Sequence, residues 1–258
     1  MDLEQRLAEL ATLRRSWRPP AAAELGERRR ASAWANAGIE GNPLSWASAR
    51  ALLAGERAAD GGRADAELLG CLSGLRFIDE EAPALPWSES LLRHLHGLLM
   101  AGLSAEAGDY RRHAVQIVRE SGPGRGEPVF RPPHAARVPE LLRELLASLE
   151  PAADPFLQAG RFHYEFQSIH PFSDGNGRLG RLLSTALARQ GWAGAGFYCE
   201  PAIRRAGAAY YLALRAVRPD YQSEPRAGLR PWLLPFLDML ADALRHPEPP
   251  VPGATAGP

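Results

Sequence analysis

The sequence contains no lysine: all thirty basic residues among its 258 are arginine, and thirty acidic residues balance them to a formal net charge of +0. A chain without lysine cannot form a Walker-type phosphate loop, which ends in Gly-Lys-Ser/Thr. Zero net charge gives no general field that would attract nucleic acid or an anionic membrane, so we expect neither as a partner. Any anion site must therefore be local.

Cysteine is also scarce. Cys71 and Cys199 are far apart and lack the close spacing typical of a zinc site or a redox dithiol, so we expect reduced thiols in the core. The chain begins Met-Asp-Leu-Glu-Gln-Arg, with acids where a secretory signal needs an apolar stretch, and no apolar run approaches the length of a membrane span. These absences predict a cytoplasmic protein, and the lysine-free composition is typical of a GC-rich bacterial genome.

The hydrophobic fraction of 45% beside 23% charged residues is sufficient for a sizeable core, and the pattern is mainly helical. Helical spacing predicts helices over residues 3–18, 21–39, 45–53, 64–78, 88–100, 138–149, 154–169, 178–189, 203–217 and 232–245. Strand-forming residues are confined to 112–118 and 129–130, on either side of a glycine-rich turn, which predicts a short β-hairpin. We therefore expect a mainly α multi-helix bundle with a hairpin flap.

The stretch that carries chemistry is residues 170–181, His-Pro-Phe-Ser-Asp-Gly-Asn-Gly-Arg-Leu-Gly-Arg. Its Gly-Asn-Gly segment leads straight into a predicted helix, so unpaired backbone N–H groups meet the positive end of the helix dipole. Arg178 and Arg181 are three residues apart, hence on one helical face, and their planar guanidinium groups suit phosphate oxygens. The pattern favours a polyphosphate site.

Two further side chains add chemistry to this anion cradle. Asp174 precedes it, where a carboxylate is useful if it holds Mg²⁺ between phosphate oxygens. His170 can take a proton near neutral pH, which makes it the candidate general base. Each element taken singly is typical of an ordinary turn or helix start. A base, a metal ligand and an anion cradle within one twelve-residue stretch indicate an enzyme.

This stretch resembles the signature of the Fic family, His-x-Phe-x-Asp/Glu-Gly-Asn-Gly-Arg-x-x-Arg, at every specified position. Residues 162–169 resemble the helix that leads into the signature, and residues 108–133 resemble the family's target-docking flap. The resemblance implies the mainly α-helical Fic fold. It also implies a protein adenylyltransferase, which uses ATP and Mg²⁺ to transfer AMP to a Ser, Thr or Tyr hydroxyl of a target protein.

The resemblance implies a role for each motif residue. His170 would deprotonate the target hydroxyl, Asp174 would coordinate Mg²⁺, and Phe172 would be a buried anchor of the loop. The residues implied to contact the nucleotide are Gly175, Asn176, Gly177, Arg178, Gly180, Arg181 and, beside the adenine, Tyr210. Where relatives often carry asparagine eight residues after that tyrosine, this chain has Arg218, which puts that contact in doubt.

An inhibitory helix at about residues 27–41 is implied as well. Residues 36–42 resemble the family pattern Ser/Thr-x-x-x-Glu-Gly/Asn, with Asn36 in place of the usual hydroxyl residue. Glu40 would then pair with Arg181 and deny that arginine to the γ-phosphate of ATP. Taken without the resemblance, Glu40 fits the C-terminus of a helix equally well.

Other candidates have ordinary explanations. His163 has no partners at metal spacing, so it is interpreted as a core histidine. His94 and His96 need no more than core or surface positions. The flap residues Val115, Gln116, Ile117 and Val118 are implied to hold an extended target segment by main-chain pairing, which conveys little about the identity of the target.

We expect a helical extension over residues 1–30, a Fic domain over 31–245 and a disordered Pro-rich tail over 246–258. Three other functions stay open: removal of AMP from a target, transfer from another phosphate-containing donor, and nucleotide-binding regulation without catalysis. A regulator would need neither His170 nor Asp174, which argues against the last. Relatives often self-associate, so a homo-oligomer also stays open.

Overall fold

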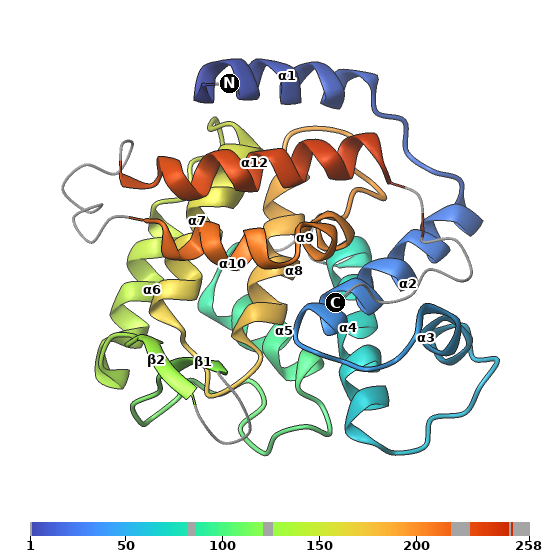
Figure 1. Ribbon diagram of the computed structural model, residues 1–258, viewed down its shortest axis with the longest axis vertical. Helices are drawn as coiled ribbons and strands as arrows, with labels where there is room; N and C mark the ends of the chain where they lie inside the picture. The colour runs from blue at the N-terminus through green and yellow to red at the C-terminus, as the bar shows by residue number, and fades with distance from the viewer. Residues whose placement is uncertain (1, 82–85, 121–125, 218–227, 248, 250–258) are drawn as a thin grey trace.

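A computed structural model describes residues 2–81, 86–120, 126–217, 228–247 and 249 (Figure 1). The first helices are α1 (Leu3–Ser16), α2 (Ala22–Ile39), α3 (Trp46–Leu53), α4 (Arg63–Glu80) and α5 (Glu89–Leu99). Two short antiparallel strands follow, β1 (Ile117–Glu120) and β2 (Gly126–Phe130). The remaining elements are the 3-10 turn η2 (Ala135–Arg137), α6 (Val138–Ala147), α7 (Pro155–Ile169), α8 (Asn176–Ala188), α9 (Glu200–Ala206), α10 (Ala208–Arg215) and α12 (Arg230–Arg245). The predicted mainly helical class is confirmed.

Local signals explain where several helices begin and end. Asp2 caps α1 and forms a capping box with Gln5, and Asp154 caps α7 just ahead of Pro155. The end of α2 is followed by Gly41 at φ +87°, a left-handed conformation that glycine adopts without the steric cost of a Cβ. This last turn places Glu40 at the C-cap of α2.

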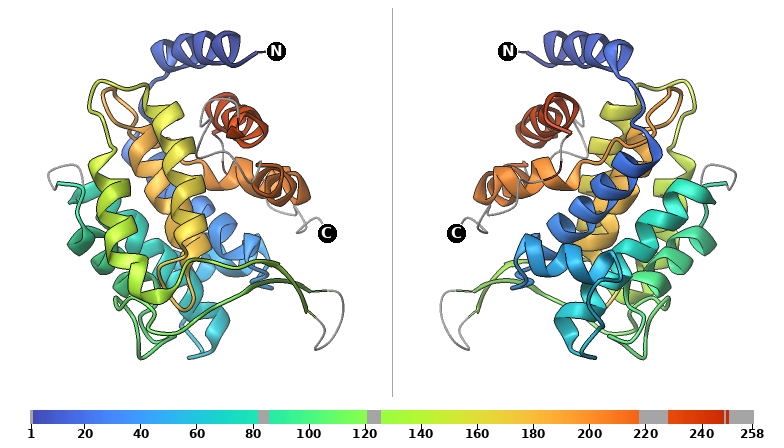
Figure 2. Two further views of the ribbon diagram at one scale, coloured as in Figure 1. Left: turned by 90° about the vertical axis from the view of Figure 1, so that its left-hand side faces the viewer. Right: turned by 90° about the vertical axis from the view of Figure 1, so that its right-hand side faces the viewer.

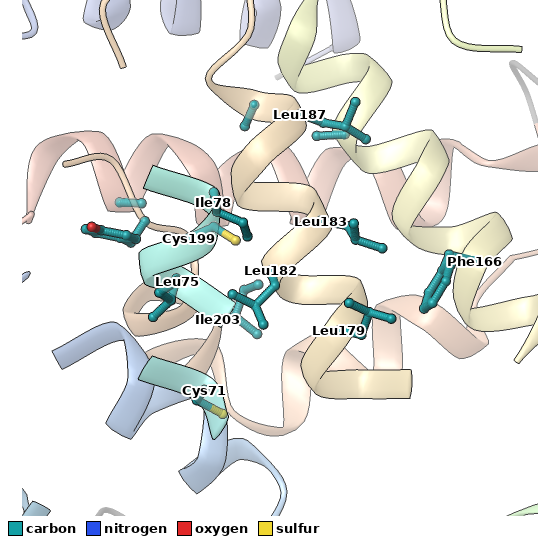
Figure 3. Packing of buried hydrophobic residues seen from close by; sticks show 14 of the residues in the cluster. Cys71, Leu75, Ile78, Phe166, Leu179, Leu182, Leu183, Leu187, Cys199 and Ile203 are labelled. Carbon is teal, nitrogen blue, oxygen red and sulfur yellow. The ribbon is translucent and has the colours of Figure 1, made fainter. Parts of the chain in front are cut away.

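Helix α8 is the centre of the molecule. It contacts α2, α4, α5, α7 and α9, and nearly all of its residues are buried. Figure 3 shows its leucines between Phe166 of α7 and the apolar side chains of α4, with Cys71 and Cys199 among them. Both cysteines are free and buried, as predicted. A helix buried on all sides is held rigidly, and the anion cradle is its first turn.

The N-terminal helices pack on this centre from two directions. α2 lies against α4 and α9, while α1 crosses over α12 (Figure 1). Leu10 of α1 is fully buried and belongs to the same hydrophobic core as α8. The predicted boundary between residues 30 and 31 falls inside α2. The N-terminal segment is thus packed on the core that supports the site.

Two expectations need correction, and two fall wholly or partly outside the described residues. The helix predicted over 203–217 is two helices, because Gly207 adopts φ +54° and ψ −125°, which a right-handed helix cannot contain. The strand predicted over 112–118 begins only at Ile117, so Val115 and Gln116 precede it. Of the tail expected over 246–258, residues 248 and 250–258 lie outside the description, as does Arg218.

The hairpin extends from the helical body (Figure 2). Its register pairs Ile117 with Phe130 and Glu120 with Gly126, with an irregularity after Ile117.

Among the residues that the structure describes, no helix has both the length and the apolar character that a membrane crossing requires.

Candidate active site

The loop from α7 to α8 starts with a backbone conformation that few residues adopt. His170 has φ +51°, the one positive φ of a non-glycine residue in the described part of the chain. A left-handed histidine costs conformational energy and persists only where its surroundings hold it. Gly175, at φ +79°, then turns the chain into α8. The loop therefore departs sharply from α7 and returns at once as a new helix.

Arg111 holds the left-handed histidine in place. Its guanidinium donates to four backbone carbonyls, those of Pro133 (2.6 Å), His170 (2.7 Å), His113 (3.1 Å) and Ile169 (3.3 Å). The Arg111 N–H also donates to the carbonyl of Pro171 at 3.0 Å. The side chain is only 3% exposed, so these bonds are shielded from water. Sequence reasoning missed this role, since an arginine that binds only carbonyls has no recognisable spacing.

The His170 ring is neutral at physiological pH. Burial is the main cause, and it lowers the pKa of His170 to about 4. Nδ1 lies 3.3 Å from the carbonyl oxygen of Gln167, and if Nδ1 donates there, Nε2 carries the free lone pair. A neutral imidazole with one free lone pair is the form that a general base requires.

Ring stacking and the hydrogen bonds of a side-chain amide hold the middle of the loop. Phe172 is fully buried, as predicted, and stacks on His96 with ring centroids 3.7 Å apart. The Asn176 side chain accepts from the N–H of Phe172 at 3.0 Å and donates to its carbonyl at 2.8 Å. The Asn176 side chain therefore holds the loop and is not directed at the predicted anion cradle. Only its backbone N–H is left for that purpose.

His96 is a second supporting residue that the sequence did not reveal. Its Nε2 lies 3.0 Å from the carbonyl oxygen of Asp174, and its Nδ1 accepts from the N–H of Gly108 at 2.8 Å. Accepting at Nδ1 requires the proton on Nε2, which then donates to Asp174. This histidine connects α5 to the loop and fixes the backbone at the candidate metal ligand.

The first turn of α8 has the free backbone N–H groups expected of the predicted anion cradle. No side chain caps it, and the N–H groups of Asn176, Gly177 and Arg178 fall where a helix has no internal acceptor. A Cβ at Gly177 would overlap the carboxylate of Glu40. Glycine at this position therefore lets that carboxylate lie against the positive end of the helix, where an anion is stabilised.

Glu40 and Arg181 form the ion pair that the resemblance implied. Glu40 Oε1 accepts from Arg181 at 2.6 Å, and Asn36 accepts from Arg181 Nε at 2.7 Å through its side-chain oxygen. Burial alone would lower the pKa of Arg181, but the facing Glu40 carboxylate raises it above the ordinary value. Arg181 is fully buried whereas Glu40 is 38% exposed, so the glutamate is the partner that can leave. Asn36 also donates to the carbonyl of Arg178 at 3.1 Å.

Asp174 stands at the exposed edge of the cradle. Burial by itself would raise its pKa, but the N–H of Gly175 at 2.6 Å and the cations Arg178 and Arg63 lower it, so the carboxylate is ionised. Among the described residues, no group of three or more His, Cys, Asp or Glu side chains could hold a metal. A single ionised, half-exposed carboxylate fits Mg²⁺, which commonly binds through one carboxylate together with substrate phosphates.

The two motif arginines have different surroundings. Arg178 is 3% exposed, and its guanidinium lies 3.4 Å from the sulfur of Met100 and 3.9 Å from Glu67. Its Nε and NH1 have no hydrogen-bond partner, nor does NH1 of Arg181. Unpaired buried N–H groups are costly, and Arg181 NH1 lies beside the cradle, 3.2 Å from the position that a Cβ of Gly177 would take. Unpaired guanidinium donors of this kind suit an anion bound at the first turn of α8.

Two residues implied to contact the nucleotide pack against other parts of the protein in the structure. A Cβ at Gly180 would overlap the Gln167 side chain, so this glycine serves the close packing of α8 on α7. Tyr210 is 2% exposed, and its hydroxyl bonds His163 Nε2 at 2.8 Å inside the core. His163 is a core residue, as interpreted, and burial lowers its pKa to about 3. The neighbouring Tyr211 is 38% exposed and donates to the carbonyl of Ile39 at 3.0 Å, one residue before Glu40.

Two large cavities lie outside the motif. One of about 530 Å³ is lined by α6, α7 and the end of β2, and another of about 740 Å³ lies between α5, α8 and the loop after α8. No residue of 170–181 lines either. The motif residues therefore lie apart from these two cavities.

Residues 86–188 match the model of the Fic/DOC family. The protein adenylyltransferase Fic of Drosophila melanogaster is 31% identical over 160 residues, which cover 60% of this chain and 31% of that protein. Its counterpart in Drosophila ananassae is 32% identical over 162 residues, with 60% and 31% covered. The chain thus spans about a third of the length of these curated relatives.

Solved structures show the same fold over most of the chain. A Fic family protein from Desulfovibrio desulfuricans superposes with a TM-score of 0.78 and 29% identity, covering 94% of this chain and 72% of that one. Fic-1 from C. elegans superposes with a TM-score of 0.72 and 22% identity, covering 95% and 70%. The chain contains a Fic/DOC domain, and family relatives are named adenylyltransferases.

Proposed function

We propose that this protein is an adenylyltransferase that transfers AMP from ATP to a hydroxyl of a target protein, and that Glu40 inhibits it. The observation that supports this most directly is the 2.6 Å pair between Glu40 and Arg181, formed above Gly177 at the start of α8. The phosphates of ATP would bind at the α8 cradle. There the Glu40 carboxylate would compete with them for the same positive charges.

The loop residues would carry out the transfer. His170 takes the proton of the target hydroxyl through its free imidazole nitrogen while the hydroxyl oxygen forms a bond to the α-phosphorus. The bond from the α-phosphorus to the bridging oxygen breaks, and pyrophosphate leaves with that electron pair. Backbone N–H groups of residues 176–178 stabilise the charge on the α-phosphate. Asp174 would hold Mg²⁺, which when bound supplies positive charge to the phosphate oxygens.

Glu40 would lower the rate without blocking the base. With Arg181 engaged, the γ-phosphate has no guanidinium to orient it, so the α-phosphorus is not held in line with the target hydroxyl. Asn36 reinforces this arrangement, since it accepts from Arg181 and donates to the backbone at Arg178. ATP would still bind, in an unproductive orientation.

The test compares AMP transfer from α-labelled ATP and Mg²⁺ by the wild type, Glu40→Gly and Glu40→Gly/His170→Ala. We expect Glu40→Gly to raise self-labelling about 10- to 100-fold, because a charge-assisted hydrogen bond contributes about 1.5–3 kcal/mol. The double variant should show no label. Glu81→Gly is the matched control, because Glu81 is the C-cap of α4 as Glu40 is of α2, and it should behave as the wild type.

Equal rates for the wild type and Glu40→Gly would remove the inhibitory role. Absence of label from every variant, with ATP binding intact, would overturn the proposed direction. A pre-labelled target could then distinguish removal of AMP from use of another donor.

A further inference from the structure

Residues on either side of the corner between α9 and α10 contact the last turns of α2. Arg204 of α9 donates to the carbonyl of Trp34 at 3.1 Å, and its guanidinium carbon lies 3.6 Å from the centroid of the Trp34 ring. Tyr211 of α10 donates to the carbonyl of Ile39 at 3.0 Å, one residue before Glu40. Figure 1 shows α9 and α10 beside the end of α2. Both contacts are made to α2, the helix whose C-cap is Glu40.

Gly38 lets the guanidinium of Arg204 reach this position. A Cβ at residue 38 would overlap the guanidinium of Arg204, so a larger residue would displace the arginine. Glycine weakens a helix interior relative to alanine because it loses more backbone freedom on folding. Its presence near the end of α2 is explained by the close approach of Arg204.

We propose that Arg204 is a positioning residue, which holds the last turn of α2 so that Glu40 reaches Arg181. This inference rests on the proposed function. Glu40 is the residue after the end of α2, so a small displacement of that turn lengthens the 2.6 Å bond to Arg181. A charge-assisted hydrogen bond weakens steeply with distance and misalignment. Loss of the Arg204 contact should therefore release the inhibition.

The experiment uses two independent variants, each with a matched control. Arg204→Met removes the donor but keeps an unbranched side chain on the Trp34 ring, and Arg205→Met makes the same change at an exposed arginine that pairs with Asp242. Gly38→Ala displaces the guanidinium, and Gly26→Ala adds the same methyl to α2 where it meets only ordinary contacts. All four are made in the wild type and in Glu40→Gly, and AMP transfer from α-labelled ATP is measured in each.

We expect Arg204→Met and Gly38→Ala to raise the wild-type rate about three- to tenfold, a partial loss of the charged hydrogen bond. In Glu40→Gly the same changes should alter the rate less than about twofold, and the controls should have no effect in either background. A residue that merely stabilises the fold would lower the rate in both backgrounds. That result, or an unchanged wild-type rate beside a strongly labelled Glu40→Gly protein, would overturn the inference and leave the proposed function intact.

Hydrogen exchange provides a readout that does not depend on catalysis. Arg204→Met should increase amide exchange over residues 36–42 and leave the start of α8 unchanged, whereas Arg205→Met should change neither. If Glu40→Gly fails to label, the proposed function fails, and the exchange measurement still decides whether Arg204 holds this turn. Unchanged exchange would exclude the positioning role.

Discussion

At the scale of single residues, the proposed site consists of a few candidate reactive groups and a larger number that hold them. His170 and Asp174 are the groups available for chemistry, while Arg111, His96 and Asn176 hold the loop that carries them. The supporting groups bind backbone atoms almost exclusively. Their effect on a reaction should therefore be on geometry, because a displacement of about 1 Å in a reacting group can lower a rate about a hundredfold.

Arg111→Met tests this supporting role. In the Glu40→Gly background we expect AMP transfer to fall about 10- to 100-fold with ATP binding little changed, since the left-handed His170 loses the cation that holds its carbonyl. The free energy of unfolding should also fall by several kcal/mol, at about 1–3 kcal/mol for each buried carbonyl left unpaired. The measurements are kcat for self-labelling and urea denaturation.

Arg112→Met is the control for that experiment, because Arg112 is exposed and adjacent. It should leave both kcat and the denaturation midpoint unchanged. A kcat for Arg111→Met equal to that of Arg112→Met would show that the loop keeps His170 in place without the arginine.

At the scale of elements, the separation of α9 from α10 determines which of their side chains contact the end of α2. Gly207 places the break one residue after α9, at φ +54° and ψ −125°. A continuous helix over these residues would place Arg204 and Tyr211 seven positions apart on nearly one face. With the break, each reaches a different turn of α2, at Trp34 and at Ile39.

Gly207→Ala should destabilise the protein by about 1–3 kcal/mol, because a residue with a Cβ is strained in this region of backbone space. Gly97→Ala is the control: it adds the same methyl inside α5, where nothing lies within 4 Å, and should stabilise by about 0.5–1 kcal/mol. Urea denaturation of both variants measures the difference. Equal midpoints would mean that the corner relaxes to accept a side chain.

At the scale of the whole molecule, one hydrophobic core reaches from Leu10 in α1 to Leu244 in α12 and encloses α8. Buried histidines within and beside this core are held neutral: burial lowers the pKa of His170 to about 4 and that of His163 to about 3. The unfolded chain takes up protons at these residues once the pH falls below their ordinary value of about 6.5. Acid should therefore favour unfolding of the whole domain.

We expect the free energy of unfolding to fall by a few kcal/mol between about pH 6.5 and pH 4, because here the unfolded state binds more protons than the folded state. Stability should be fully present above pH 6.5. His163→Gln should reduce the slope of the unfolding free energy against pH by up to about 1.4 kcal/mol per pH unit. His113→Gln, at an exposed position, should leave that slope unchanged. Denaturation curves at several pH values test this, and a slope that His163→Gln leaves unchanged would contradict it.

The sequence by itself determined most of the helices and the residue pattern of the 170–181 loop, and its resemblance to the Fic family implied the pairing partner of Glu40. The helices and the loop depend on residues near one another in sequence or on a recognisable spacing, and the implied Glu40–Arg181 bond is present at 2.6 Å. The tertiary structure decided which neighbours meet those residues. Tyr210 is buried, Gly180 packs against the Gln167 side chain, and Arg111, His96 and Arg204 have partners 59, 78 and 170 positions away. Helical spacing gives the face of a residue, but only packing determines what lies against that face, because contacts between distant segments depend on the whole core.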